Sequence, residues 1–437
     1  PLLPVPVSST ASSPPGSSTA VRLAYLAAGA GGMYCGSCIH DNTLSAALQR
    51  QGLDVALIPL YTPLRTDEDS VSLERVFYGG INVFLEQKSS LFRHLPRGLT
   101  RVLDRPDLLR WVTSRWSSAT DARDLGALTV SVLQGEDGHQ RKELDDLVTW
   151  LGREFRPDLV QLPNSMFLGM TRQLQRDLCV PVLCEVAGEE IFLDQLIEPF
   201  RSQARRILSE RARDVDGFVA PCHFYADAMA DYLQVSRDHF HVVPLGLQLQ
   251  GHDGSPQPAR AEEPFRIGFL ARICPQKGLH IAAEALEILA ERLGHEAIRL
   301  EVAGWLGDSD RAYLDGIHQR LQSRGLGELF NVIGEVDRRA KIDFLRGLHV
   351  LTVPAPYHEP KGLYVLEALA NGVPVVQPRH GAFPEMLEET GGGILVDAAE
   401  ALPVADAIQA LIEDEENRLR LGREGQNNVW QTRSDDI

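Results

Sequence analysis

The feature that most constrains the fold is a strand-then-helix alternation that occurs twice along the chain. In the first half, short β-branched and apolar runs predict strands at 21–29, 53–61, 81–86, 158–163, 180–186, 216–221 and 239–245. Helical patterns fit between most of them, at 41–51, 144–155, 167–177 and 191–213. Strands that alternate with helices predict a parallel sheet with helices on both faces.

The second half repeats this alternation after a break. Residues 246–264 are polar, rich in Gly and Pro and without periodicity, which is typical of a linker. Strands are then expected at 265–271, 298–304, 329–336, 349–355, 373–378 and 393–397, with helices at 279–292, 311–323, 340–345, 363–371 and 401–412. Because 437 residues are too many for one core, we predict an α/β protein of two doubly wound, Rossmann-like domains. A ligand would lie in the cleft between them, at the carboxyl ends of the strands.

The expected domain boundaries follow from this pattern. Residues 1–20 are rich in Pro and Ser and carry no charged side chain, which predicts a disordered leader. The first domain is expected at 21–247, the linker at 248–264 and the second domain at 265–420. A C-terminal helix at 421–437 is expected to cross back to the first domain.

Composition narrows the classes of partner and compartment. The formal net charge of −17 argues against a nucleic acid held by charge. No apolar run reaches the roughly 18 residues of a membrane span, and no secretory signal is visible. The basic amphipathic stretch 92–115 is interpreted as a surface helix pair, with peripheral membrane contact as the alternative. Six cysteines form no disulfide framework in a chain of this length, which favours a reducing, cytoplasmic compartment.

Two segments of the second half suit a phosphorylated sugar ligand. In HEPKGLYVLEALANGVPVV (358–376), Glu359 precedes a predicted helix and Glu367 lies in its first turns. A helix N-terminus offers unpaired N–H groups to a phosphate, and carboxylates on either side suit the hydroxyl groups of a sugar nucleotide. In GFLARICPQKGLH (268–280), Arg272 and Lys277 flank a turn before a helix, as cations suited to a diphosphate. The alternative for this second segment is a solvated turn with exposed charges.

The loop after the first predicted strand reads AGGMYCGSC (30–38), and its glycines would let backbone approach a ligand closely. Its spacing is not G-x-G-x-x-G, which argues against a nicotinamide site. Cys35 and Cys38 are interpreted as structural thiols, since zinc would need a second ligand pair; a redox pair is the alternative. Asp-x-Asp strings at 67–69, 214–216 and 308–310 lack the setting of a metal–diphosphate site and are interpreted as surface acids.

On these motifs the chain resembles the retaining glycosyltransferases of family 4 (glycosyl transferases group 1), which have the GT-B fold. The resemblance rests on the Glu-x7-Glu spacing of Glu359 and Glu367, on the helix and turn at 367–375, and more loosely on 268–278 and 381–385. It extends through almost all of the C-terminal half and covers the N-terminal half in outline.

The resemblance implies transfer of a hexosyl unit from a nucleoside diphosphate sugar to a hydroxyl acceptor, with retention at the anomeric carbon and without a metal or other cofactor. The residues expected to act in catalysis, on the donor sugar and the diphosphate, are Glu359, Arg272 and Lys277. Those expected to bind the rest of the donor are Glu367 at the ribose, Gly362 and Leu363 at the phosphates, Gly31 and Gly32 in the cleft, and Glu335 near the base.

The chain departs from the family pattern at three places. Lys361, between the two glutamates, stands where relatives often have an aromatic residue, so the edge of the sugar pocket is expected to differ. The first loop has Met-Tyr-Cys in place of a polar run. The segment 184–190 replaces a common His-Gly pattern, which makes Glu189, Glu190 and Asp194 candidates for the acceptor side; a helix N-terminus with favourable acids is the alternative.

Several readings stay open from the sequence. The donor is a UDP-, GDP- or ADP-sugar, and the acceptor is a saccharide or a small polyol. A glycosyl phosphorylase or sugar-nucleotide epimerase of the same fold is one alternative, and a catalytically silent sugar-nucleotide-binding protein is another. The intact set of Arg272, Lys277, Glu359 and Glu367 argues against the silent protein.

Overall fold

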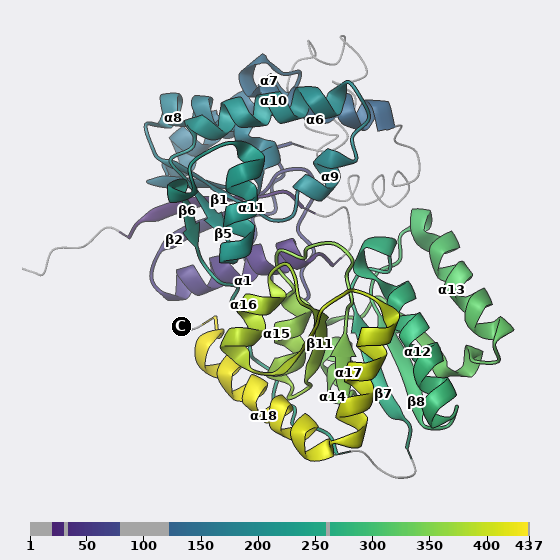
Figure 1. Ribbon diagram of the computed structural model, residues 1–437. Coiled ribbons are helices and arrows are strands. Elements are labelled where there is room, and N and C mark those ends of the chain that lie inside the picture. Colours follow the sequence, from purple (N-terminus) through teal and green to yellow (C-terminus); the bar gives the residue numbers. More distant parts are fainter. Residues whose placement is uncertain (1–19, 30–33, 79–121, 259–262, 436–437) are drawn as a thin grey trace, which may run out of the picture.

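The computed structural model describes residues 20–29, 34–78, 122–258 and 263–435. Within them the chain forms two α/β domains, each built on a parallel six-stranded sheet. Figure 1 shows the N-terminal domain in purple to teal and the C-terminal domain in green to yellow. None of the helices in this part of the chain combines the length and the apolar character that a membrane span requires.

The N-terminal sheet has the strand order β2-β1-β3-β4-β5-β6. Its strands are β1 Arg22–Ala27, β2 Asp54–Pro59, β3 Leu159–Leu162, β4 Val182–Glu185, β5 Gly217–Ala220 and β6 Phe240–Val242. Its helices are α1 Gly36–Arg50, α6 Ala122–Gln134, α7 Arg141–Trp150, α8 Thr171–Leu178, α9 Glu190–Asp194, α10 Phe200–Arg211 and α11 His223–Leu233. The strands are apolar and largely buried because helices cover the sheet, as the unbroken hydrophobic runs predicted.

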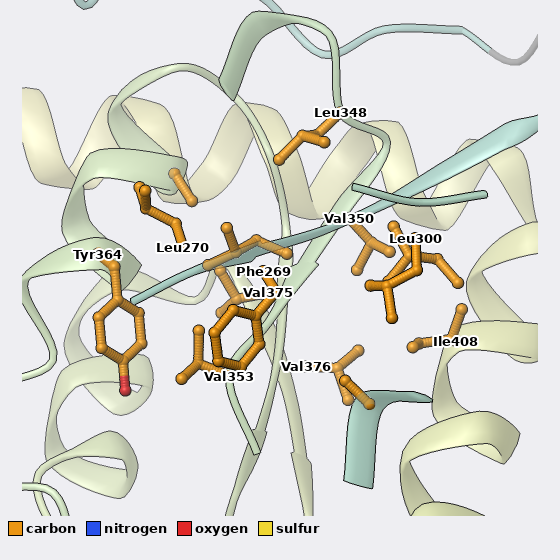
Figure 2. Packing of buried hydrophobic residues seen from close by; sticks show 14 of the residues in the cluster. Phe269, Leu270, Leu300, Leu348, Val350, Val353, Tyr364, Val375, Val376 and Ile408 are labelled. Carbon is orange, nitrogen blue, oxygen red and sulfur yellow. The ribbon is translucent and has the colours of Figure 1, made fainter. Parts of the chain in front are cut away.

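The C-terminal sheet has the order β12-β11-β10-β7-β8-β9. Its strands are β7 Phe265–Leu270, β8 Ile298–Ala303, β9 Phe330–Gly334, β10 Val350–Thr352, β11 Val375–Pro378 and β12 Gly393–Val396. Its helices are α12 Leu279–Leu293, α13 Arg311–Ser323, α14 Arg338–Arg346, α15 Leu363–Ala370, α16 Phe383–Thr390, α17 Ala401–Glu413 and α18 Glu415–Thr432. Figure 2 shows their core, where Phe269 of β7 and Val375 of β11 lie in one cluster with Ile408 of α17.

Every predicted strand in the described residues is present, while the one expected at 81–86 lies outside them. The single helix expected at 191–213 is wrong, because α9 ends at Asp194 and α10 begins at Phe200. Pro199 lies between them, and a proline disfavours helical backbone in the residue before it. Helix α1 begins at Gly36, earlier than expected, because Cys35 is its extended N-cap residue.

The two domains touch directly and through the chain end. Glu385 at the start of α16 accepts hydrogen bonds from the backbone N–H groups of His223 (2.8 Å) and Phe224 (2.6 Å), so it caps a helix of the other domain. Helix α18 packs on α15, α16 and α17 of its own domain. Asp435, beyond that helix, forms an ion pair of 2.5 Å with Arg50 of α1.

Candidate active site

A cleft of about 410 Å³ lies between the domains, at the carboxyl ends of both sheets. The C-terminal domain contributes the segments that follow β7, β8 and β9, together with the start of α15. The N-terminal domain contributes the first turn of α1, the backbone after β4, and one loop residue after β2. This is the edge at which doubly wound sheets bind ligands.

The turn after β7 presents the two predicted cations to the cleft. Gly278 ends this turn with φ +77°, and a Cβ there would lie 2.1 Å from the carbonyl oxygen of Pro354, so the close approach requires glycine. Lys277 donates to the hydroxyl of Tyr357 (2.6 Å) and forms an ion pair with Glu359. Arg272 is exposed to the cleft and has no ion pair within the described chain. Arg272 therefore offers the uncompensated charge for an anion.

Glu359 is a buried, preorganised hydrogen-bond acceptor. It accepts from the hydroxyl groups of Tyr357 (2.7 Å) and Tyr364 (3.2 Å) as well as from Lys277. Burial opposes ionisation, but the Lys277 ammonium and these hydrogen bonds hold the pKa of Glu359 below its usual value. The ionised carboxylate is thus fixed at the cleft wall, where it can accept hydrogen bonds from sugar hydroxyl groups.

The N-terminus of α15 opens into the same cleft. Gly362 is its N-cap residue with φ +65°, a conformation that favours glycine, and both Gly362 and Leu363 line the cleft. The first N–H groups of a helix have no partner within the helix, and they carry the positive end of its dipole. Together with Arg272, this helix start forms an anion site suited to a diphosphate.

Glu367, one turn further along α15, belongs to a buried cluster that spans both domains. The ammonium of Lys341, on α14, lies 2.5 Å from Glu367 Oε1 and 2.5 Å from Asp67 Oδ2. Asp67 comes from the loop after β2, and its side chain is only 2% exposed. The interpretation of Asp67 as a surface acid is therefore wrong, because this loop folds across the cleft.

Charge in this cluster is unevenly balanced, with two carboxylates around one ammonium. Burial raises the pKa of Glu367; the Lys341 ammonium opposes this shift and the Asp67 carboxylate adds to it. Burial would lower the pKa of Lys341, but its two carboxylate neighbours raise it above the usual value. Lys341 is thus held charged, and the cluster retains acceptor capacity on its carboxylates.

Glu335, expected near the donor base, lines the cleft just after β9. One of its oxygens accepts from the backbone N–H of Tyr34 (3.0 Å), and the other lies 3.1 Å from Arg65. Both partners belong to the N-terminal domain, so Glu335 helps to hold the domains together. Gly31 and Gly32, expected to line the cleft, lie outside the described residues.

Lys361 also connects the domains, in a way that the sequence did not indicate. Its ammonium lies 2.8 Å from Oε1 of Glu185, at the end of β4, and both residues are buried. Glu185 also accepts from the hydroxyl of Tyr25 (2.7 Å) and lies 3.5 Å from Nε2 of His40. Burial disfavours both charges, but their mutual attraction holds the pKa of Glu185 low and that of Lys361 high.

A metal at this place would compete with that lysine. His40, Asp41 and Glu185 offer ligand atoms within 4.8 Å of one another. The ammonium of Lys361 already neutralises Glu185 there, so the cluster carries its own cation. Burial, with Glu185 nearby, raises the pKa of Asp41 well above its usual value.

Cys35 is the N-cap residue of α1 and lines the cleft, and Cys38 lies in the first turn of that helix. A hydrogen bond with Cys38 lowers the pKa of Cys35 to about 5, with backbone N–H groups and Lys361 adding to the effect and burial opposing it. The pKa of Cys38 is raised by the same hydrogen bond and by burial. Cys35 therefore has the character of a thiolate within the cleft.

The three acceptor-side candidates are not brought into the cleft. Glu189 accepts from the backbone N–H groups of Ser165 (2.9 Å) and Ala187 (2.7 Å), which makes it a support of the loop after β4. Glu190 accepts from the hydroxyl of Tyr225, and Asp194 from that of another tyrosine. None of the three is among the described residues that line the cleft, because each is turned toward these partners.

The residues that sequence reasoning missed are Asp67, Lys341 and Glu185; His40 was considered only as a third zinc ligand beside Cys35 and Cys38. For Glu185 the sequence did contain one local signal, because a charged residue at the end of a buried strand lies at the sheet edge where ligands bind. Lys341 and Asp67 left none, because their burial arises from a contact between loops and helices far apart in the chain.

Comparisons with known proteins match both halves of the chain. The family model of glycosyl transferases group 1 matches residues 254–428, and that of the glycosyl transferase 4-like domain matches residues 42–246. The chain is similar to the D-inositol 3-phosphate glycosyltransferase of Corynebacterium efficiens, at 26% identity over 51% of this chain and 54% of that protein. The protein of the same name from Nocardia farcinica is 25% identical over 65% of this chain and 60% of that protein. The matches thus span less than two thirds of these relatives.

Two solved structures are similar along almost the whole chain. HepE from Anabaena, solved in complex with UDP, has a TM-score of 0.64 and 16% identity over 95% of this chain and 96% of that chain. Sucrose-phosphate synthase from Thermosynechococcus elongatus has a TM-score of 0.65 and 17% identity over 95% of each chain. At these identities the likeness establishes the fold alone.

Proposed function

Since this chain belongs to the family 4-like, group 1 glycosyltransferases of the GT-B fold, we propose that it transfers a hexosyl unit from a nucleoside diphosphate sugar to a hydroxyl acceptor. The main support for this proposal is that Arg272, Lys277, Glu359 and the N-terminus of α15 all line one cleft. HepE has been solved with UDP and with UDP-glucose, which supports a UDP-sugar as the first donor to test. The D-inositol 3-phosphate glycosyltransferases among the relatives support a polyol or saccharide acceptor.

The geometry suggests how bond cleavage is assisted. As the bond between the sugar and the diphosphate breaks, negative charge builds on the leaving diphosphate. Arg272, Lys277 and the α15 dipole stand at one place to stabilise that charge where it develops. Glu359 accepts hydrogen bonds from sugar hydroxyl groups and so orients the reacting carbon.

Retention and metal independence are further parts of the proposal. Attack by the acceptor hydroxyl on the face that the diphosphate leaves, with the hydroxyl proton passing to an oxygen of the departing diphosphate, would give retention without a protein nucleophile. The protein cations and the helix dipole supply the charge stabilisation that a metal provides in other enzymes. We expect turnover to be unaffected by a chelator, and NMR of the product to show the anomeric configuration of the donor.

A cytoplasmic location is also proposed. All six cysteines are free in the structure, which supports a reducing compartment. The basic stretch 92–115, the candidate for peripheral membrane contact, lies outside the described residues.

The test is a thermal-shift and turnover panel of UDP-, GDP- and ADP-sugars. We expect one nucleotide class to raise the melting temperature, and Arg272→Ala to weaken its binding about 10- to 100-fold, because a charge-assisted hydrogen bond to phosphate contributes about 1.5–3 kcal/mol. Arg311→Ala is the matched control, since that arginine is paired with Asp308 on the surface. No shift with any nucleotide, or normal binding by Arg272→Ala, would contradict the proposal. Binding without turnover would instead indicate a silent sugar-nucleotide-binding protein.

A further inference from the structure

We propose that Asp67 of the N-terminal domain accepts a hydrogen bond from a ribose hydroxyl of the donor, opposite Glu367, so that the nucleoside is held by both domains. This inference rests on the proposed sugar-nucleotide donor. It assigns a donor-binding role to a loop of the domain that otherwise faces the acceptor.

The first observation is a buried acceptor atom without a partner. Asp67 Oδ2 is 2.5 Å from the Lys341 ammonium, but within the described part of the chain Oδ1 has no hydrogen-bond partner, although the side chain is only 2% exposed. A buried carboxylate oxygen without a donor costs free energy, which a hydrogen bond from a ligand would recover. Asp67 lines the cleft, so a donor hydroxyl of a bound ligand can fill this place.

The second observation is the position of Asp67 relative to the phosphate site. Glu367 stands four residues after Leu363, which corresponds to about 6 Å along the axis of α15 from the N–H groups that face the diphosphate. A ribose follows the diphosphate in a sugar nucleotide at about that spacing. Because Lys341 bridges Glu367 and Asp67, the two carboxylates stand side by side there. Two adjacent acceptors match the two adjacent hydroxyl groups of a ribose.

The third observation is that the loop is held rigidly from both sides. Glu68, next to Asp67, accepts from the hydroxyl of Thr43 on α1 (2.9 and 2.8 Å) and lies 3.6 Å from Arg338 on α14. On the other side of Asp67, Arg65 lies 3.1 Å from Glu335. Anchors on both domains fix the Asp67 carboxylate before a ligand arrives, which is the condition for a selective contact.

The competing role for Asp67 is purely structural, as an ion-pair link between the domains. A link would affect every nucleotide equally, whereas a ribose contact depends on one hydroxyl group. The discriminating measurement is therefore the affinity of the full-length protein for UDP and for its 2′-deoxy and 3′-deoxy analogues by calorimetry. GDP or ADP and their analogues replace them if the donor panel selects another base.

We expect the wild-type protein to bind one deoxy analogue at least about 10-fold more weakly than the parent nucleotide, through loss of one hydrogen bond to a charged group. In Asp67→Ala that penalty should fall to within about twofold. Asp67→Leu, which fills the site without a hydrogen-bonding atom, is the second variant in case Asp67→Ala does not fold. Glu385→Gln is the matched control, because Glu385 also links the two domains, through the backbone N–H groups of His223 and Phe224, but neither lines the cleft nor contacts the Asp67 loop; it should keep the full penalty.

Three outcomes decide the matter. A penalty that disappears in the Asp67 variants and persists in Glu385→Gln supports the ribose contact. Equal weakening of the parent nucleotide and both analogues, or an unchanged penalty in the Asp67 variants, overturns the inference and leaves the proposed function intact. Failure of the wild-type protein to bind any of the nucleotides overturns the proposed function, and the inference with it.

Discussion

Replacing Lys361 by methionine tests the buried ion pair that joins the domains. The ammonium of Lys361 is 2.8 Å from Glu185, and the two residues are 8% and 3% exposed. Methionine keeps the unbranched shape and most of the length of the lysine side chain but removes its charge, so Glu185 stays buried without its cation. Removing one partner of a buried pair costs about 3–5 kcal/mol. We expect the lower end, about 3 kcal/mol, because Glu185 keeps the hydrogen bond from Tyr25 (2.7 Å).

The dependence of the stability loss on pH is a second, independent test of this prediction. In the wild type the pKa of Glu185 is lowered by Lys361, so the pair contributes stability above the ordinary carboxyl pKa and loses it as pH falls. In Lys361→Met that carboxyl pKa is raised by burial instead, and the carboxyl takes up a proton as pH falls. The stability that Lys361→Met loses relative to the wild type should therefore be largest at pH 7.5 and should shrink as pH falls toward about 4.3, the usual glutamate pKa.

The assay is urea unfolding of the wild type, Lys361→Met, Glu185→Gln and the double variant at several pH values. The double variant is the control. Its loss should be within about 1 kcal/mol, because a buried ion pair and an uncharged pair of similar volume are often close in stability. A loss below about 1 kcal/mol at pH 7.5 in Lys361→Met, or a loss that does not change with pH, would refute the reasoning.

Three further predictions concern a thiol, a carboxyl group and a glycine. Cys35 should react with iodoacetamide with a half-maximal rate near pH 5, and a bound nucleotide should slow the reaction. The reaction is followed by mass spectrometry, with the exposed Cys179 as the internal reference. A midpoint near pH 8.5 for Cys35 would contradict the thiolate assignment. Burial raises the pKa of Glu190 to about 7. The neutral carboxyl therefore contributes stability that is fully present below the pKa of this glutamate in the unfolded chain and is lost as pH rises through about 7. Glu190→Gln should accordingly raise the melting temperature at pH 8.5 by the equivalent of about 1–3 kcal/mol and change it little at pH 5; equal effects at both pH values would contradict this. Gly278→Ala should lower the free energy of unfolding in urea by more than about 2 kcal/mol, since its Cβ would lie 2.1 Å from a carbonyl oxygen. Gly52→Ala, at φ +91° with open space around it, should lower the free energy of unfolding by only about 1 kcal/mol. Similar losses in both variants would show that backbone conformation, not the clash, dominates.

The architecture could be predicted from the sequence because its signals are local. The runs at 265–271 and 298–304 became β7 and β8 within a residue or two, since a buried parallel strand is a short apolar stretch whatever it pairs with. The helix at 191–213 was wrong for an equally local reason, since the effect of Pro199 was not weighed against the periodicity.

In the candidate site, too, the residues with a local signal could be predicted and the others could not. Arg272, Lys277, Glu359 and Glu367 could be named because each lies within a few residues of a strand end or a helix start, and those places follow from the local pattern. Glu189, Glu190 and Asp194 had a similar setting but were turned away by partners that the segment itself does not reveal.

The sequence by itself thus determined two Rossmann-like sheets, the edge at which a ligand binds, and the cations and carboxylates of the C-terminal wall. Only the tertiary structure decided how the two domains meet. Lys361 and Glu185 are 176 positions apart, and the Asp67 loop reaches Lys341 on the opposite domain. Such pairs depend on where two rigid bodies bring their loops together, and no periodicity or propensity within either segment encodes that distance.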